Sequence, residues 1–362
     1  MVEILIGFRI SDLFQLFKQN NFAISPQQVP KLQSLAFTGS RSSIYYQKEK
    51  KRFAHQIINT EIKNPPIFIL GHWRSGTTFF HQLLSLDEQF NYPTVFEVYN
   101  PHNFLITEPL LKEKLQKMDA QKRPMDNVSI KPTDPAEEEF AISAFTLKSP
   151  VLGWAFPRNE RYYDRYINLI GLPANDINKW KASYVYFLKK LSFQDKRPLL
   201  LKSPPNTARS HFLRALFPQA KFIHIYRNPY TVYQSTEKLY RETVRKFHMQ
   251  KGLDSDTLSD RIINRYKDMY DQFFADQPDI PDENYFEICF EQLQTDFEGI
   301  FYKLYQHFNW AGFDKFKQQL HSYLGSNKSY QKTKHQPISE DIIKKINEKW
   351  TKSFERWNYP FQ

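Results

Sequence analysis

The chain has 362 residues, of which 41% are hydrophobic and 16% aromatic, and this is enough for one large α/β domain with a sizeable core. Its 50 Lys and Arg residues exceed its 39 Asp and Glu residues, and the formal net charge of +11 favours an anionic partner. The single cysteine, Cys289, excludes a disulfide framework within the chain, and the dispersed basic residues give no reason to expect a nucleic-acid partner.

The first 60 residues are expected to form a helical extension. An apolar stripe near its start consists of Ile4, Leu5, Phe8, Leu13, Phe14, Leu16 and Phe17. The stripe predicts either a helix packed on the domain or an interfacial helix in peripheral contact with a membrane. The run KEKKR at 48–52 could reinforce such contact or form an ordinary solvated helix face.

The N-terminus lacks the basic region and clean apolar stretch of a secretory signal. No segment approaches the ~18 uninterrupted apolar residues of a membrane-spanning helix. The single cysteine fits a reducing compartment. We therefore expect a cytoplasmic protein, with peripheral membrane contact as an open alternative.

Residues 67–86, IFILGHWRSGTTFFHQLLSL, predict a strand, a loop and a helix. Residues 67–70 are apolar, as in a buried strand, and from Thr77 onward apolar residues recur at helical spacing. Gly71 and Gly76 bound the loop and permit a backbone path that other residues resist. Because successive N–H groups and the positive end of the helix dipole converge there, the sequence predicts a phosphate-binding cradle.

This loop differs from the one that binds nucleoside triphosphates. In the pattern G-x-x-x-x-G-K-[ST] a lysine follows the second glycine and reaches the β/γ-phosphates, whereas Thr77 stands at that place here. The cation of the loop is Arg74, whose guanidinium can make paired contacts with phosphate or sulfate oxygens. We expect a nucleotide used without triphosphate–magnesium chemistry, and a P-loop kinase with a degenerate loop is the alternative.

A second anion site is predicted further along the chain. Residues 198–203 and 221–227 predict two more buried strands, which bring Lys202 and Arg227 to strand ends. Asn228 suits a helix cap and Pro229 the first helical position, so Ser235 falls on the following helix. Arg227 and Ser235 can therefore meet one anion from the strand end and from the helix.

These two motifs resemble those of the sulfotransferases that use 3′-phosphoadenosine-5′-phosphosulfate (PAPS). GHWRSGTT resembles the 5′-phosphosulfate-binding loop of the family, and Arg227 with Ser235 is similar to its 3′-phosphate-binding motif. The intervening sequence resembles the bacterial branch that acts on small molecules and lipids. No linker rich in Gly, Ser or Pro separates the motifs, so we expect a single domain over 1–362. The resemblance implies the P-loop NTPase-like fold, a three-layer α/β sandwich with a central parallel sheet and helical additions. Residues 92–190 would then form the acceptor-pocket region.

The resemblance also implies roles for individual residues. Arg74 and Lys202 match the loop cation and the catalytic lysine of the family, while Arg227 and Ser235 would hold the 3′-phosphate of PAPS and of the product, 3′,5′-adenosine bisphosphate (PAP). Further cosubstrate contacts are expected from loop and helix-start residues, namely Gly71, Ser75, Gly76, Thr77 and Thr78. A basic C-terminal loop that contains Lys328, Lys332 and Lys334 is expected to add a contact through Lys328. No metal is required.

Transfer to a hydroxyl needs a base for the acceptor proton, and three sets of candidates remain open. Glu97 comes first, since it lies close to the position of a catalytic glutamate in the branch that sulfates tyrosine. His102 comes second, because its unperturbed pKa suits proton abstraction near neutrality. One of three consecutive glutamates, Glu137, Glu138 and Glu139, comes third. Cytosolic members carry a histidine two residues after the catalytic lysine, but Pro204 occupies that place here.

The expected reaction is in-line transfer of a sulfuryl group from PAPS to a hydroxyl of a hydrophobic small molecule or lipid, such as a sterol, a quinol or another alcohol or phenol. Aromatic richness and the apolar N-terminal segment support this acceptor class. The alternatives are the P-loop kinase and a basic membrane-surface binding protein. Towards the C-terminus we expect a strand at 285–290, a helical stretch to Phe308 and a final helix over 338–357 that packs through Trp350, Phe354 and Trp357.

Overall fold

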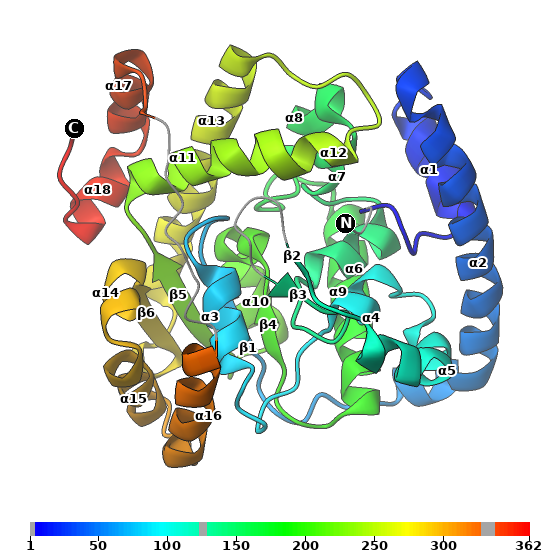
Figure 1. Ribbon diagram of the computed structural model, residues 1–362, viewed down its shortest axis with the longest axis horizontal. Coiled ribbons are helices and arrows are strands. Elements are labelled where there is room, and N and C mark those ends of the chain that lie inside the picture. The colour runs from blue at the N-terminus through cyan, green and yellow to red at the C-terminus, as the bar shows by residue number, and fades with distance from the viewer. Residues whose placement is uncertain (1–3, 123–128, 327–336) are drawn as a thin grey trace.

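A four-stranded parallel sheet lies at the centre of the computed structural model, which describes residues 4–122, 129–326 and 337–362 (Figure 1). Across the sheet the order is β4 (Leu200–Lys202), β1 (Ile67–Leu70), β5 (Lys221–Tyr226) and β6 (Tyr285–Cys289). Ile67 is in register with Leu200 on one side and Lys221 on the other. The chain thus adds strands on both sides of β1, and in such sheets ligands bind at the carboxyl ends beside this switch in strand order.

Alternate strand residues face opposite sides of the sheet and form two apolar cores. On one side Ile69, Leu200 and Ile225 pack against helices that are α3 (Thr77–Leu84), α14 (Phe290–Thr295), α15 (Phe297–His307) and α16 (Phe313–Ser326). On the other side Phe68 and Leu201 pack against helices that are α9 (Ala174–Gln194), α10 (Ser210–Leu216) and α13 (Ser255–Asp276). The predicted three-layer α/β sandwich is confirmed.

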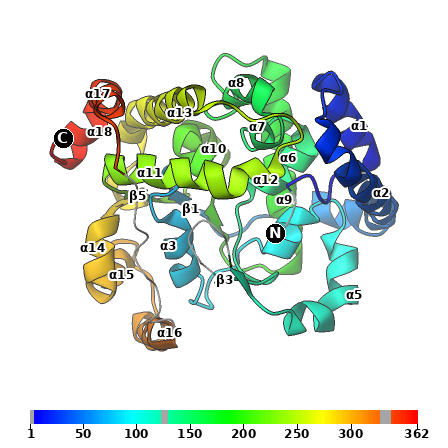
Figure 2. The same cartoon turned by 45° about the horizontal axis from the view of Figure 1, so that its top comes forward.

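Helix α11 (Pro229–Leu239) follows β5 directly and crosses the end of the sheet in both cartoon views (Figures 1 and 2). Its cap is the predicted one, since the Oδ1 atom of Asn228 accepts a hydrogen bond from the backbone N–H of Thr231 at 3.2 Å. A π-helical turn, Tyr240–Val244, then leads into α12 (Arg245–Phe247). Helix α11 therefore starts at the carboxyl edge of the sheet, where the predicted anion sites lie.

Within the stretch 92–190, the part before α9 consists mainly of loops and short helices, as predicted, and the long helix α9 begins at Ala174. Its further elements are α4 (Val95–Tyr99), α5 (Phe104–Lys117), β2 (Gln121–Lys122), β3 (Ser129–Ile130), α6 (Glu139–Thr146), α7 (Leu152–Ala155), a 3₁₀ turn at Pro157–Asn159 and α8 (Glu160–Asp164). Strands β2 and β3 pair with each other in an antiparallel hairpin, separate from the central sheet. Other 3₁₀ turns are Pro26–Gln28, Pro204–Arg209, Gln277–Asp279 and Asp282–Asn284.

The N-terminal extension forms α1 (Ile10–Gln19) and α2 (Val29–Ile58). Every residue of the predicted apolar stripe is buried in the core except Phe14, which confirms the packed-helix alternative for the stripe. The stripe is not one helix, because Gly7 has a φ of +87° and a Cβ there would lie 1.9 Å from the carbonyl oxygen of Tyr99. Helix α1 therefore begins only at Ile10, after this close approach.

The charged run 48–52 is solvated only in part. Lys48, Lys50, Lys51 and Arg52 are exposed, but Glu49 is buried and forms an ion pair of 2.5 Å with Lys190 of α9. The prediction of an ordinary solvated face is therefore wrong for Glu49, because its carboxylate neutralises a lysine in the interior and ties α2 to α9.

The predicted final helix is divided in two, α17 (Glu340–Lys349) and α18 (Thr351–Trp357). The helix breaks at Trp350, whose indole Nε1 donates to the carbonyl of Ile263 at 2.9 Å while its ring stacks on Tyr266. The predicted burial of Trp350, Phe354 and Trp357 is confirmed. Within the described ranges, no helix combines the length and apolar character needed to cross a membrane.

Candidate active site

The loop between β1 and α3 is pressed against its neighbours at both glycines. The N–H of Gly71 donates a hydrogen bond of 2.7 Å to the Oγ1 of Thr207. A Cβ at residue 71 would lie 2.4 Å from the carbonyl oxygen of Ile225. Gly76 has a φ of +96°, and a Cβ there would lie 2.1 Å from the ring of Phe290. Both positions need glycine, so strand β5 and the Phe290 ring fix the curved path into α3.

The structure brings the loop cation to the second motif. The Nε of Arg74 donates a hydrogen bond of 2.8 Å to the Oγ of Ser235, although 161 residues separate the two in sequence. The Nη1 of Arg227 donates to the carbonyl oxygen of Arg74 at 3.3 Å, and its guanidinium lies 4.8 Å from the centre of the Phe290 ring. Two guanidinium groups and a hydroxyl thus meet at the carboxyl edge of β1 and β5, which suits a ligand with more than one anionic group.

Lys202 ends β4 and points its ammonium at the first turn of α3. Its Nζ donates to the Oγ1 of Thr78 at 3.2 Å and to the Oε1 of Glu137 at 2.5 Å, and the Lys202 side chain is buried. Ser75 and Thr77 of the loop are buried as well. The structure therefore places a lysine, a carboxylate and a threonine hydroxyl together beside the predicted phosphate cradle.

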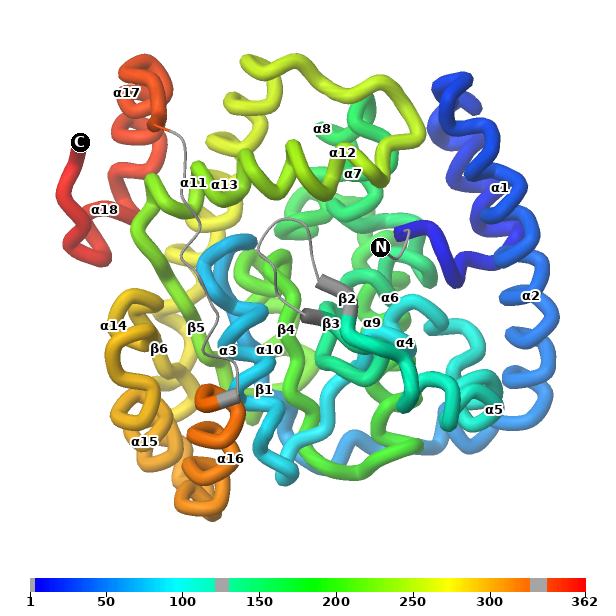
Figure 3. Tube along the Cα trace, in the orientation of Figure 1, coloured from blue at the N-terminus to red at the C-terminus, as the bar shows by residue number. Residues whose placement is uncertain are grey.

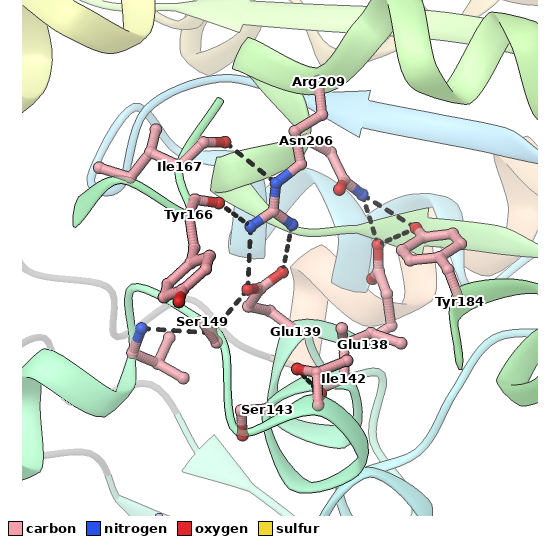
Figure 4. Close-up of polar contacts among 12 residues, drawn as sticks. Glu138, Glu139, Ile142, Ser143, Ser149, Tyr166, Ile167, Tyr184, Asn206 and Arg209 are labelled. Atoms are coloured by element: carbon pink, nitrogen blue, oxygen red, sulfur yellow. Dashed lines mark hydrogen bonds and ion pairs between the residues drawn. The ribbon is translucent and has the colours of Figure 1, made fainter. Parts of the chain in front are cut away.

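Each of the three consecutive glutamates has its own partner. Glu137 lies on Lys202, while Glu138 accepts hydrogen bonds from the Tyr184 hydroxyl at 2.7 Å and from the Asn206 Nδ2 at 2.6 Å (Figure 4). Burial raises the pKa of the Glu138 carboxyl to about 7. These bonds tie the start of α6 to α9 and to the turn after β4, so Glu138 helps to hold Glu137 in place.

Glu139 forms a fully buried ion pair with Arg209 in the same region. The two side chains are 0% exposed, and their N···O distance is 2.6 Å (Figure 4). The Ser149 hydroxyl also donates to Glu139 at 2.6 Å, and Arg209 donates to the carbonyl of Ile167 at 3.0 Å. The polar groups of the pair are thus matched in the interior, and the pair anchors α6 to the segment after β4.

We expect Arg209→Leu to lower the free energy of unfolding by roughly 3–5 kcal/mol, because it leaves the Glu139 carboxylate buried without its cation. Urea unfolding of the purified protein measures this change. Lys315→Ala is the matched control, since it breaks an ion pair of the same 2.6 Å length between two exposed side chains and should leave the unfolding midpoint unchanged. Equal midpoints for both variants would contradict the anchoring role.

Glu97, the first candidate for the base, caps α4. Its Oε2 accepts a hydrogen bond of 2.6 Å from the N–H of Thr94, and the Thr94 hydroxyl accepts one of 3.2 Å from the N–H of Glu97. This reciprocal capping box fixes the start of α4. Burial raises the pKa of the Glu97 carboxyl to about 8.

His102, the second candidate, is buried against the N-terminal helices. Its Nε2 lies 3.5 Å from the Oδ2 of Asp12 in α1, and its ring packs edge-on against Tyr46 and Phe145. Burial is the main cause that lowers the pKa of His102. The geometry accounts for His102 as a link between α1, α2 and α6.

Glu137 belongs to the third set of base candidates predicted from the sequence, whereas Thr207 and Phe290 were not predicted as site residues. The run of three glutamates inside an apolar context was the available signal for Glu137. Thr207 and Phe290 act through contacts with Gly71 and Gly76 that are remote in sequence, so no local pattern marks them. Lys328, Lys332 and Lys334 lie outside the described residues. Within the described ranges no three His, Cys, Asp or Glu side chains gather to hold a metal ion, and a metal-free reaction stays a prediction.

Comparison with known proteins identifies the family. Residues 65–315 match the profile described as Sulfotransferase family. This chain belongs to the sulfotransferase family. The sulfotransferase is 31% identical over 355 residues to the omega-hydroxy-beta-dihydromenaquinone-9 sulfotransferase Stf3 of Mycobacterium bovis and to that of Mycobacterium tuberculosis. Each alignment covers 98% of this chain and 90% of the relative.

Two solved structures share the fold of this sulfotransferase. Sulfotransferase STF9 from Mycobacterium avium superposes with a TM-score of 0.72 at 15% identity, over 97% of this chain and 91% of the other. Sulfotransferase STF1 from Mycobacterium tuberculosis H37Rv superposes with a TM-score of 0.60 at 16% identity, over 92% and 90%. Family membership makes the protein an enzyme of sulfuryl transfer, implies PAPS as the donor, and sets aside the kinase alternative.

Proposed function

We propose that this sulfotransferase transfers the sulfuryl group of PAPS to a hydroxyl of a hydrophobic lipid alcohol, such as a hydroxylated isoprenoid quinol. The observation that carries the proposal is the meeting of Lys202, Thr78 and Glu137 beside the loop of Arg74. The acceptor class is supported by the name of the relatives, which act on a menaquinone derivative and align with nearly the whole chain. A sterol or a phenol is a second acceptor of the same apolar character.

The residues at the carboxyl edge of the sheet fit PAPS. PAPS supplies an activated sulfuryl group when bound, and it carries anionic groups at both ends. Gly71, Gly76 and the first turn of α3 offer a backbone path closed to larger residues, with the Thr77 and Thr78 hydroxyls at the helix start. Arg227 and Ser235 would hold the 3′-phosphate, and Lys328 keeps its expected role in the same contact.

We assign the acceptor proton to Glu137. Its carboxylate lies 2.5 Å from the Lys202 ammonium, so the base and the cation are held side by side. Glu137 takes the proton as the acceptor oxygen forms its bond to sulfur, and Lys202 stabilises the negative charge that gathers on the leaving phosphate oxygen as the old S–O bond breaks. Arg74 would contribute the positive charge of the loop, with its guanidinium on the Ser235 side of the site.

Glu137 thus replaces Glu97 and His102 as the first candidate for the base. Glu97 uses its carboxylate to cap α4, and His102 is buried against Asp12 and two aromatic rings. Glu137 lies on the lysine that matches the catalytic lysine of the family. Both earlier candidates therefore become controls for the base.

Thermal unfolding with nucleotides tests the cosubstrate site. PAP should raise the melting temperature with concentration, whereas AMP and ATP–magnesium should have little effect, because a ligand at 100 times its Kd stabilises the folded state by about 2.7 kcal/mol. Arg227→Ala and Ser235→Ala should remove the PAP shift. Arg214→Ala is the control and should keep the rise in melting temperature with PAP, because Arg214 lies on α10 and pairs with Asp279 at 3.6 Å. A shift with ATP–magnesium and none with PAP would contradict the proposal.

The same preparation tests the acceptor. With radiolabelled PAPS and detergent-dispersed acceptors, a long-chain isoprenoid alcohol should be sulfated, whereas its analogue without the hydroxyl and a water-soluble sugar should not. Sulfation of the sugar alone would overturn the acceptor class while leaving the cosubstrate site standing.

A further inference from the structure

We propose that the outward surface of α1 and α2 docks on an anionic lipid bilayer. This α1–α2 surface, which includes the turn after α1, carries large apolar side chains that are between 41% and 71% exposed, namely Ile10, Phe14, Phe22, Phe37 and Ile44. The two helices lie side by side at one edge of the molecule in all views (Figures 1, 2 and 3). The docking surface goes beyond the proposed transfer and is argued independently of it.

Local contacts hold the apolar residues of α1 together and set α1 against α2, while Phe37 and Ile44 form a stripe on α2. The backbone N–H of Ile10 donates to the Ser43 hydroxyl at 3.0 Å, which sets Ile10 beside the turn of α2 that carries Ile44. The rings of Phe14 and Phe22 lie 5.7 Å apart. Phe37 and Ile44 are two helical turns apart and therefore share one face of α2.

The exposed charges of the same helices are all positive. Lys18, Arg41, Lys48, Lys50, Lys51 and Arg52 are exposed on α1 and α2. The acidic residues of these helices, Asp12 and Glu49, are buried and are paired with Arg9 and Lys190. On α2 the residues Phe37, Arg41, Ile44 and Lys48 follow one another at spacings of three or four. Cations and apolar groups therefore alternate along one face of the helix.

This chemistry fits a membrane better than another macromolecule. Apolar side chains with interleaved lysines and arginines bind the headgroup region of a bilayer, where anionic lipids attract the cations. A second copy of the chain would bring an equally cationic surface, so a two-fold dimer here would oppose like charges.

The membrane-facing residues differ from those expected in the sequence. The apolar stripe from Ile4 to Phe17 packs inward, and only Phe14 belongs to both sets. Asp12 of α1 lies 3.5 Å from His102 in the region expected to form the acceptor pocket. A docked α1–α2 surface would thus bring the acceptor region close to the bilayer in which a lipid alcohol dissolves.

Vesicle sedimentation of the full chain tests the proposal. The wild type should bind phosphatidylcholine vesicles that contain about 30% phosphatidylglycerol, and bind pure phosphatidylcholine weakly, with a loss on adding salt. Phe14→Ser with Phe37→Ser, and separately Lys48→Gln with Lys51→Gln, should each weaken binding by at least about tenfold. Tyr302→Ser is the control, because Tyr302 is 50% exposed on α15, which lies on the opposite side of the molecule from α1 and α2 (Figure 1).

Absence of wild-type binding, or binding by both double variants that equals that of the wild type, would overturn the proposal. A dimer that Phe14→Ser with Phe37→Ser dissociates, with no vesicle binding, would assign the surface to a second copy and overturn it as well. All variants should keep the PAP-dependent rise in melting temperature. Loss of that rise in the wild type would count against the proposed function and leave the vesicle result untouched.

Discussion

Lys202→Ala should lower kcat by about 10²- to 10³-fold, the effect of removing one preorganised group that stabilises transition-state charge. Strand β4 delivers the Lys202 side chain to the carboxyl edge of the sheet, in register with Ile69 two residues before Gly71. There its ammonium lies between Thr78 and Glu137 and is buried, so its charge acts with little screening by water. Initial rates with radiolabelled PAPS at saturating acceptor measure the change.

Two comparisons separate a catalytic effect from a structural one. Lys202→Ala should keep the PAP-dependent rise in melting temperature, because Arg227 and Ser235 hold the other end of the nucleotide in the proposed site. Lys221→Ala removes a lysine from the amino end of β5, where its Nζ donates to Asn284 at 2.6 Å, and should keep full turnover. Turnover of Lys202→Ala within a factor of about three of the wild type would rule out the proposed role of its charge.

The fold could be predicted where local signals are strong. The buried strands, the glycine-bounded loop and the Asn228–Pro229 helix start are set by residues that are adjacent in sequence, and each was found. The two cores follow from this pattern, because parallel strands linked by helices form a sheet covered on both faces. The order of the strands does not follow from it and comes from the structure.

The missed features depend on contacts between distant segments. Trp350 breaks the final helix because its indole finds the carbonyl of Ile263 in α13. Glu49 looks solvated within a run of lysines, yet it pairs with Lys190 in the interior. His102 and Glu97 are chemically suitable bases whose surroundings only the tertiary structure shows. The sequence shows which side chains carry a charge, but only the tertiary structure shows which residue each of them pairs with.

Glu137→Gln should lower kcat by about 10²- to 10⁴-fold, the range for loss of a positioned general base. Glutamine keeps the size of the side chain and can still accept a hydrogen bond from Lys202, but its amide cannot take the proton of the acceptor. The KM for PAPS should change much less than kcat, because the proposed 3′-phosphate site does not include Glu137. Glu137→Ala should recover part of its rate with added formate, which can supply a small carboxylate.

The matched variants are Glu97→Gln and His102→Asn. A glutamine at the third position of α4 can preserve the capping box with Thr94, so Glu97→Gln should keep full turnover. His102→Asn should lower the melting temperature, since it removes a ring packed against Tyr46 and Phe145, while the remaining folded enzyme stays active. If Glu97→Gln loses turnover at unchanged stability and Glu137→Gln does not, the proton goes to Glu97. The contact between Glu137 and Lys202 would then serve only to position the lysine.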